Sequence, residues 1–245
     1  MKDLSDEELA ARLAEEAGRL LLELRGAAGG ANGLGIAGDK AANAWLIDSL
    51  AEARPDDAIL SEESPDLLKR LQCERVWIID PLDGTREYAE GRDDWAVHVA
   101  LAIDGVPAIG AVAIPAHGRL FRSGRVRLPP APDRVRPIML VSRTRPPPET
   151  EAVADLLGAD LVAMGSAGAK AMAVVAGEAD IYLHSGGQHE WDNCAPAAVA
   201  LAAGLHASRI DGSPLVYNQA DTCMPDLLIA RPEYAPAILS YCASR

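Results

Sequence analysis

The chain has few aromatic residues and few positively charged residues, and its negative net charge restricts the ligands that it can bind. Only 4% of its 245 residues are aromatic, and one of them is a Phe. Lys and Arg number 23 against 36 Asp and Glu, which gives a formal net charge of −13. A chain this acidic is unsuited to binding a nucleic-acid polymer. An anionic substrate would need metal ions or helix N-termini to offset the repulsion.

Cysteine and long apolar runs are scarce as well. The four cysteines show no CxxC pair and no zinc-like spacing. We therefore expect reduced thiols and a cytoplasmic protein. No apolar run approaches the roughly 18 residues that a membrane span needs, and the acidic, amphipathic start does not resemble a signal peptide. We expect no membrane association.

What the chain does have is apolar content, 49% of its residues, which is enough for a sizeable core. Ser5 and Glu8 predict a capping box for a helix that ends at Gly26. The segment 27–38 is predicted to be a mobile loop, with Asp39 as the N-cap of a second helix. A largely antiparallel sheet is expected next, from strands 58–61, 76–79, 95–103, 106–114 and 119–122.

The second half of the chain alternates strands with helices. The proline-rich segment 126–137 is the predicted boundary. Beyond it we expect strands 138–142, 160–163, 179–183 and 227–230, and helices 149–157, 165–176, 193–203 and 234–242. This pattern predicts an α/β (α+β) fold. We expect one catalytic unit, residues 1–245, in two packed halves of about 1–130 and 131–245.

One stretch concentrates the chemistry: the apolar strand Val76–Ile79 runs directly into the residues DPLDGT at 80–85. Asp80 and Asp83 at the end of a buried strand would repel each other unless a cation lay between them, and oxygen ligands suit Mg²⁺. The N–H groups of Gly84 and Thr85 would then face an anion. Asp, Pro and Gly are also ordinary turn residues, so the stretch by itself is equally consistent with a plain turn.

Two further acids occupy similar boundary positions. Glu62 follows the strand 58–61, and Asp192 precedes an alanine-rich helix. Strand ends in α/β sheets converge on one crevice, so these acids and the DPLDGT pair are predicted to meet. With two or three Mg²⁺ ions they would suit hydrolysis of a phosphoester by activated water. His98, in the middle of a strand, is interpreted as a core histidine.

Three stretches make the pattern specific: LSEES at 60–64, DPLDGT at 80–85 and EWD at 190–192. In this order they resemble the signature of the inositol monophosphatase superfamily, and the resemblance covers nearly the whole chain. It implies a layered αβαβα sandwich. GSA at 165–167 with Lys170, and the longer run to Tyr88, are similar to the 3'(2'),5'-bisphosphate nucleotidase branch.

The resemblance also implies roles for individual residues. The implied metal ligands are Glu62, Asp80, the carbonyl of Leu82, Asp83 and Asp192, holding two or three Mg²⁺ ions. The implied catalytic residues are Glu62, Thr85 and Asp39, with Thr85 bonded to Asp39 to orient the attacking water. The stretch before Asp39 lacks the usual Thr or Ser, which weakens that pairing. The implied substrate contacts are Glu62, Leu82, Asp83, Gly84, Thr85, Ser166, Lys170 and Asp192.

Two of these substrate contacts have simpler alternatives. Ser166 suits a hydroxyl at a helix start, and Lys170 suits a solvated lysine. Trp191, Tyr88 and Lys170 weakly favour an aromatic ligand that carries two phosphates.

The implied activity is Mg²⁺-dependent conversion of 3'-phosphoadenosine 5'-phosphate to AMP and phosphate, which recycles a by-product of sulfate activation and is sensitive to Li⁺. The alternative is a broader phosphatase for inositol 1-phosphate or fructose 1,6-bisphosphate. A third hypothesis is a catalytically silent metal-binding or partner-binding protein. The expected partner is a small phosphorylated substrate, and a homodimer is possible because the family often forms dimers.

Overall fold

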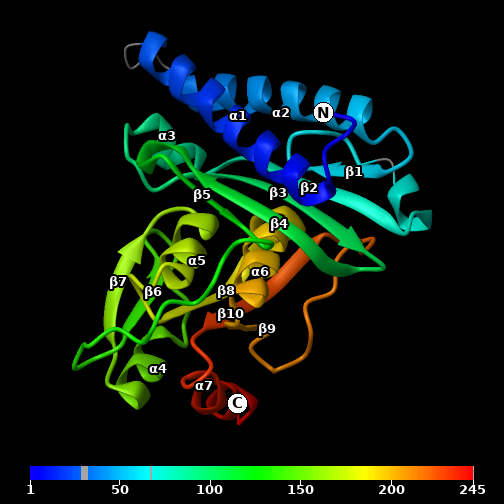
Figure 1. The fold of residues 1–245 in the computed structure, drawn as a ribbon. Coiled ribbons are helices and arrows are strands. Elements are labelled where there is room, and N and C mark those ends of the chain that lie inside the picture. The colour runs from blue at the N-terminus through cyan, green and yellow to red at the C-terminus, as the bar shows by residue number, and fades with distance from the viewer. Residues whose placement is uncertain (29–32, 67, 245) are drawn as a thin grey trace.

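The computed structural model describes residues 1–28, 33–66 and 68–244. Its helices and sheets stack in five layers, α-β-α-β-α, from α1 and α2 at the top of Figure 1 to α4 and α7 at the bottom. The predicted αβαβα sandwich is confirmed. The prediction of one catalytic unit in two halves stays a prediction.

The first sheet lies under α1 (Asp6–Ala28) and α2 (Leu34–Ala53) and has the strand order β1-β2-β3-β4-β5. Only β1 and β2 run parallel; the remaining neighbours are antiparallel. The strands are β1 (Ala58–Ser61), β2 (Arg75–Asp83), β3 (Ala96–Ile103), β4 (Val106–Ile114) and β5 (Arg119–Arg122). The short helices of this half are η1 (Lys69–Gln72), α3 (Thr85–Ala89) and η2 (Pro115–His117).

The start of α2 corrects two predictions. Residues 34–38 are helical, and Asp39 lies inside α2, so it is not an N-cap. Gly33, with a φ of 83°, is the cap instead, because glycine adopts this left-handed conformation at little cost. The helix α1 also continues past Gly26 to Ala28. The rest of the predicted loop, residues 29–32, lies outside the described residues.

The second sheet has the order β7-β6-β8-β10-β9, in which β6 runs parallel to β7 and β8, while β10 is antiparallel to its neighbours. Its strands are β6 (Ile138–Ser142), β7 (Asp160–Met164), β8 (Ile181–His189), β9 (His206–Ser208) and β10 (Cys223–Ala230). Its helices are α4 (Thr150–Leu157), α5 (Ala167–Val175), α6 (Glu190–Ala203) and α7 (Ala235–Ala243). The strand β9 was not predicted, and α6 begins before Asp192 rather than after it.

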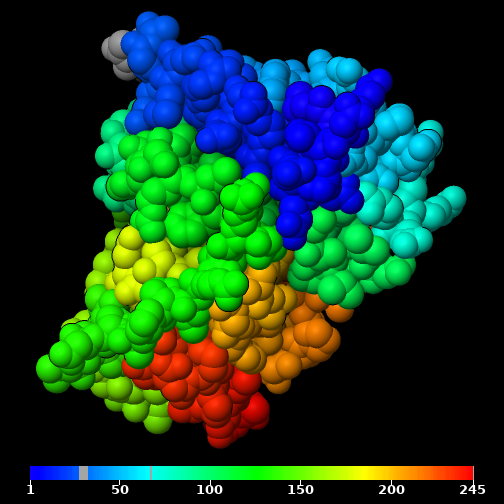
Figure 2. Space-filling model, in the orientation of Figure 1, coloured from blue at the N-terminus to red at the C-terminus, as the bar shows by residue number. Residues whose placement is uncertain are grey.

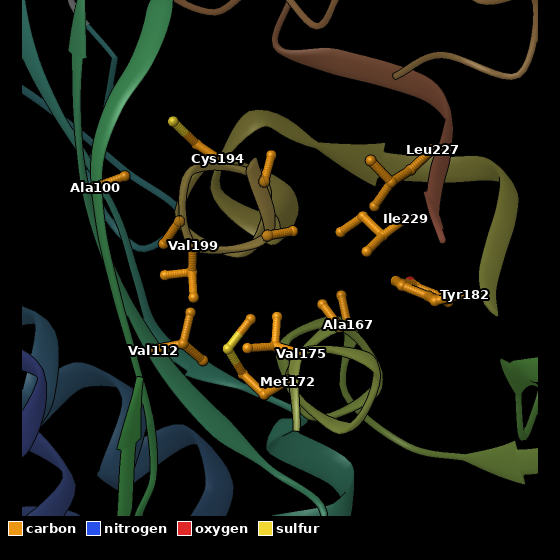
Figure 3. Close-up of a cluster of buried hydrophobic side chains, with 14 of the residues drawn as sticks. Ala100, Val112, Ala167, Met172, Val175, Tyr182, Cys194, Val199, Leu227 and Ile229 are labelled. Carbon is orange, nitrogen blue, oxygen red and sulfur yellow. The ribbon is translucent and has the colours of Figure 1, made fainter. Parts of the chain in front are cut away.

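The strand β2 is buried on both faces because it is a continuous apolar run whose successive side chains point to opposite faces. Trp77 and Ile79 pack against α1 and α2, while Val76 and Ile78 face the middle layer of α5 and α6. Figure 3 shows that middle layer, with Val199 of α6 and Val175 of α5 between the two sheets. A strand covered on both faces delivers its last residues deep inside the molecule.

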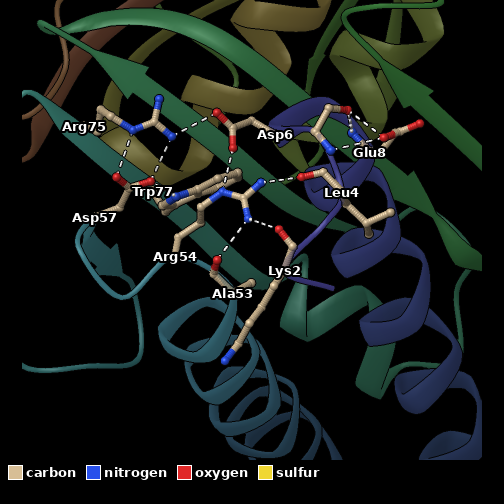
Figure 4. A network of polar contacts seen from close by, with 10 residues as sticks. Lys2, Leu4, Asp6, Glu8, Ala53, Arg54, Asp57, Arg75 and Trp77 are labelled. Carbon is tan, nitrogen blue, oxygen red and sulfur yellow. Dashed lines mark hydrogen bonds and ion pairs between the residues drawn. The ribbon is translucent and has the colours of Figure 1, made fainter.

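A polar network fixes the outer helices to the same strand (Figure 4). Arg75 on β2 donates to Asp57 at 2.8 Å and to Asp6 of α1 at 2.9 Å. Asp6 also accepts from Arg54 at 2.7 Å, and Trp77 Nε1 donates to Asp57 at 2.8 Å. The network therefore anchors the start of α1 and the end of α2 to β2.

The structure also bears on the expectations about membrane spans and cysteines. Within the described ranges, none of the helices combines the length and the apolar character that a membrane crossing requires. Cys73, Cys194 and Cys223 are free thiols.

Candidate active site

The end of β2 and the start of α6 bring three acids together. A shift in the pairing of β2 with β3 falls between Asp80, which lies opposite His98, and Asp83, which lies opposite Ala96. Asp192 reaches the same point from the first turn of α6. One carboxylate oxygen from each of Asp80, Asp83 and Asp192 lies within 4.8 Å of the other two. The predicted convergence of these acids is therefore present in the fold.

The acids raise one another's pKa values. Glu62 joins the cluster because β1 runs parallel to β2, so the two strands end side by side. Burial, then the charges of Glu62 and Asp83, raise the pKa of Asp80 well above its usual value. Part of Glu62 is open to solvent, yet burial of its carboxyl and the nearby Asp39 raise its pKa to about 7. Burial and Asp83 raise the pKa of Asp192 to about 7 as well. A cation would relieve this repulsion.

Asp83 is the exception, because the N-terminus of α5 holds its negative charge. Its carboxylate accepts hydrogen bonds from Ser166 Oγ at 2.5 Å, from the Ala167 N–H at 3.1 Å and from the Gly168 N–H at 2.7 Å. Burial alone would raise the pKa of Asp83. The contacts with His98, Ser166 and Gly168 outweigh burial and lower it to about 2.

His98 is a contact of this cluster that sequence reasoning missed. The residue is fully buried, as expected of a core histidine. Its Nε2 lies 3.2 Å from Asp83 Oδ2, which is within ion-pair distance, but the angle does not suit a hydrogen bond. Its Nδ1 lies 3.0 Å from the Trp191 carbonyl oxygen. A Cβ at Gly168 would lie 2.0 Å from that Nε2. The signal in the sequence was a histidine in the apolar strand that pairs with the DPLDGT strand.

The predicted pairing of Thr85 with Asp39 is present. Thr85 Oγ1 lies 3.3 Å from Asp39 Oδ2 and 3.0 Å from the Leu82 carbonyl oxygen. Asp39 is buried in α2, and its Oδ1 has no hydrogen-bond partner among the described residues. Burial, then the charge of Glu63, raise the pKa of Asp39 to about 7. The hydroxyl of Thr85 therefore connects a buried acid with the turn that carries Asp83.

Ser166 and Lys170 both form hydrogen bonds in the turn before α5. Ser166 is the N-cap of α5, with a φ of 52° that residues with side chains rarely adopt. The Lys170 ammonium donates to the carbonyl oxygens of Gly165 at 3.2 Å and Ser166 at 2.5 Å, and it is 4% exposed. Burial lowers the pKa of Lys170 to about 8. Lys170 is therefore no solvated lysine, and its direct contact with substrate stays a prediction.

A cavity of about 150 Å³ adjoins Asp83 and Asp192, and its lining includes Arg145, His184 and Tyr182, which were not predicted as site residues. Arg145 is exposed there and forms no ion pair within the described part of the chain. His184 is buried, with Nε2 2.8 Å from the Gly186 carbonyl oxygen and Nδ1 without a partner among the described residues. Tyr182 lines the cavity beside it.

Two aromatic residues that weakly favoured an aromatic ligand do not line this cavity. Tyr88 is fully buried, and its hydroxyl donates to the Leu21 carbonyl at 2.8 Å. Trp191 stacks on His189, with 4.8 Å between the ring centroids. The argument from Tyr88 is therefore wrong, because packing directs this residue into the core beneath α1, whereas the argument from the half-buried Trp191 stays a prediction.

The chemistry of the clustered donors suits a hard divalent cation. All the donors are carboxylate oxygens, with the Leu82 carbonyl in the same turn, and such oxygens favour Mg²⁺, Ca²⁺ or Mn²⁺ over softer metals. Four neighbouring acids, of which three have raised pKa values, gain from a positive charge between them.

Comparisons with known proteins agree with this geometry. Residues 6–241 match the model of the inositol monophosphatase family. The 3'-phosphoadenosine 5'-phosphate phosphatase of Mycobacterium leprae is 52% identical over 97% of this chain and 93% of its own length. The 3'(2'),5'-bisphosphate nucleotidase CysQ of Escherichia coli K12 is 31% identical over 76% of this chain and 80% of its own. The crystal structure of CysQ from Bacteroides thetaiotaomicron superposes with a TM-score of 0.82 at 26% identity, covering 92% of this chain and 97% of that one.

Proposed function

Because the chain belongs to the inositol monophosphatase family, we propose that it is a Mg²⁺-dependent phosphomonoesterase that converts 3'-phosphoadenosine 5'-phosphate to AMP and phosphate. The observation that carries the proposal is the convergence of Asp80, Asp83 and Asp192 beside a cavity lined by Arg145, which has no ion pair with any described residue. The identity of 52% with a phosphatase named for this substrate supports the choice of nucleotide.

In this proposal Glu62, Asp80, the Leu82 carbonyl, Asp83 and Asp192 hold two or three Mg²⁺ ions. Bound ions of this kind lower the pKa of a coordinated water and neutralise charge on the leaving oxygen. The contacts from Ser166, Ala167 and Gly168 keep Asp83 ionised, so this ligand carries its negative charge before a metal ion binds.

Thr85 and Asp39 orient the attacking water. The hydroxyl proton of Thr85 points to Asp39 or to the Leu82 carbonyl, which leaves the oxygen lone pairs to accept a hydrogen bond from the water. The backbone N–H groups of Gly84 and Thr85, at the start of α3, are the donors proposed for the scissile phosphate. Gly84 has a φ of 90°, and a Cβ there would lie 3.3 Å from that of Ser166. Glycine therefore allows this close approach.

Selectivity for a bisphosphate nucleotide is assigned to the outer cavity. Arg145 is the proposed contact for the 5'-phosphate, since its side chain lines the cavity beside the acid cluster and pairs with no acid in the part of the chain that the structure describes. Burial lowers the pKa of His184, so the ring is neutral; with Nε2–H donating to the Gly186 carbonyl, Nδ1 is left as an acceptor for an O–H or N–H of the nucleoside. Lys170 holds the turn that contributes Ser166.

The second candidate is a broader phosphatase for inositol 1-phosphate and fructose 1,6-bisphosphate. The acid cluster serves all three substrates equally, and the small cavity beside it has an exposed Arg145 rather than an enclosed nucleotide pocket. We also propose a cytoplasmic location, supported by the free thiols of Cys73, Cys194 and Cys223. A homodimer stays a prediction.

Phosphate release with Mg²⁺ tests the proposal. The values of kcat/KM are compared for 3'-phosphoadenosine 5'-phosphate, inositol 1-phosphate and fructose 1,6-bisphosphate, with EDTA as the metal-free control. We expect the nucleotide to be preferred about a hundredfold, or about 2.7 kcal/mol of transition-state binding. Comparable values for all three substrates would favour the broader phosphatase. Full activity in EDTA would rule out the metal assignment.

A further inference from the structure

A second cavity, of about 750 Å³, lies away from the acid cluster and is lined by arginines. It lies between α1, β5, the segment after β5 and the end of α5, on the face shown in Figure 2, where the green segment runs from the blue α1 past the yellow region of α5. Its lining includes the arginines Arg12, Arg119, Arg122, Arg125 and Arg127.

Three of the arginines that line the cavity have no acidic partner within the described residues. Five arginines line it against two glutamates, Glu8 and Glu15. Within the described residues, Arg12 pairs with Glu16 and Arg119 with Glu178, whereas Arg122, Arg125 and Arg127 form no ion pair.

Glu8, one of the two acids that line the cavity, is already bonded to Ser5. The Glu8 carboxylate accepts from the Ser5 hydroxyl at 2.8 Å and from the Ser5 N–H at 3.1 Å, in the capping box of α1. Neighbouring Arg122 and Arg125 therefore keep guanidinium donors available for a ligand. Like charges that line one cavity repel one another, and an anion bound between them would reduce the repulsion.

The rest of the lining gives the ligand class. The half-buried Leu120, Phe121 and Val126 add an apolar wall, with the Arg119 guanidinium 4.8 Å from the centre of the Phe121 ring. The cavity volume falls within the range of small-molecule sites. Guanidinium groups bind phosphate through paired N–H donors, while an apolar wall accepts the flat face of a ring. We propose that this arginine cavity binds a nucleoside polyphosphate, at a site separate from the catalytic pocket.

The helix α5 connects the two sites physically. Residues 166–168 at its start bond Asp83, and Val175 at its other end lines the arginine cavity. Its nine residues span about 13 Å. A ligand that contacts the end of α5 therefore contacts the helix on which the position of Asp83 depends.

Calorimetric titration of the EDTA-treated protein with ADP tests the site, because without metal the catalytic acids repel phosphate. We expect ADP to bind, and the double variant Arg122→Gln/Arg125→Gln to weaken binding at least about tenfold. The control is Lys2→Gln/Lys69→Gln, which removes the same charge from two exposed lysines outside the cavity and should leave the affinity within about twofold. Arg127→Gln provides a second test if the double variant does not fold.

Three outcomes would overturn the inference. The first is the absence of ADP binding at millimolar concentration. The second is an equal loss of affinity in the arginine and lysine variants, since net charge alone would then explain binding. The third is inorganic pyrophosphate binding as tightly as ADP, because the apolar wall would then contribute nothing. The proposed catalytic function does not depend on any of these results, and phosphate release is measured separately.

Discussion

Two neighbouring acids of the catalytic cluster should respond in opposite ways to the loss of a charge. Asp80→Asn removes a carboxylate whose pKa is raised well above its usual value by burial and by the charges of Glu62 and Asp83. Because the pKa of Asp80 is higher in the folded protein than in the unfolded chain, ionisation of Asp80 destabilises the folded state. The cost begins above the pKa of the unfolded chain and is complete above the pKa of the folded protein. We therefore expect metal-free Asp80→Asn to melt at or above the wild-type temperature at about pH 8, with the difference disappearing near pH 4.

Asp83→Asn should instead destabilise the metal-free protein. Oδ2 of Asp83 accepts from Ser166 and Gly168, and Oδ1 accepts from the Ala167 N–H. The amide nitrogen of an asparagine would turn toward the side with fewer donors and leave the buried N–H of Ala167 without an acceptor. One unsatisfied buried donor costs roughly 2 kcal/mol, which lowers the melting temperature by roughly 4–8 °C in a chain of this size.

Differential scanning calorimetry in EDTA measures both effects, and phosphate release with Mg²⁺ measures activity. The control is Asp155→Asn, which makes the same chemical change at an exposed position of α4 and should alter neither property. Both cluster variants should lose about a hundredfold or more in kcat, since each removes a proposed ligand. The reasoning would be refuted if metal-free Asp80→Asn lost as much stability at pH 8 as Asp83→Asn.

Three further variants test individual residues. Arg145→Gln should raise KM for the bisphosphate nucleotide about tenfold and change KM for inositol 1-phosphate less than about twofold, because only the first substrate has a second phosphate; equal changes would contradict the assignment. His98→Ala should weaken Mg²⁺ binding about tenfold in a calorimetric titration, and His98→Asn, which keeps a donor for Asp83, should recover part of it; an asparagine no better than alanine would mean that the contact with Asp83 is unimportant. Thr85→Ala should lower kcat about a hundredfold at unchanged KM, whereas Thr85→Ser, which keeps the hydroxyl beside Asp39, should retain most activity; equal losses in both would exclude the hydroxyl.

Local sequence predicted most elements of the fold because their signals repeat at short range. Neighbouring residues are enough to predict the apolar run of β2, the Asp104-Gly105 turn between β3 and β4, and the helix that ends before Gly204. Where a single local signal was ambiguous, the prediction failed. Asp39 suits an N-cap, but α2 begins at Leu34, and packing places Asp39 beside Thr85 instead.

The sequence by itself determined which acids stand at strand ends and helix starts, because strand periodicity and the DPLDGT and EWD stretches are contiguous. Only the tertiary structure decided what those acids touch. Asp83 meets Ser166 across 83 positions of sequence, and His98 reaches the carbonyl of Trp191 across 93. The unpaired Arg145 and the arginine cavity likewise depend on which charges packing leaves without partners. Burial and pairing are properties of the assembled layers, and no short stretch of sequence encodes them.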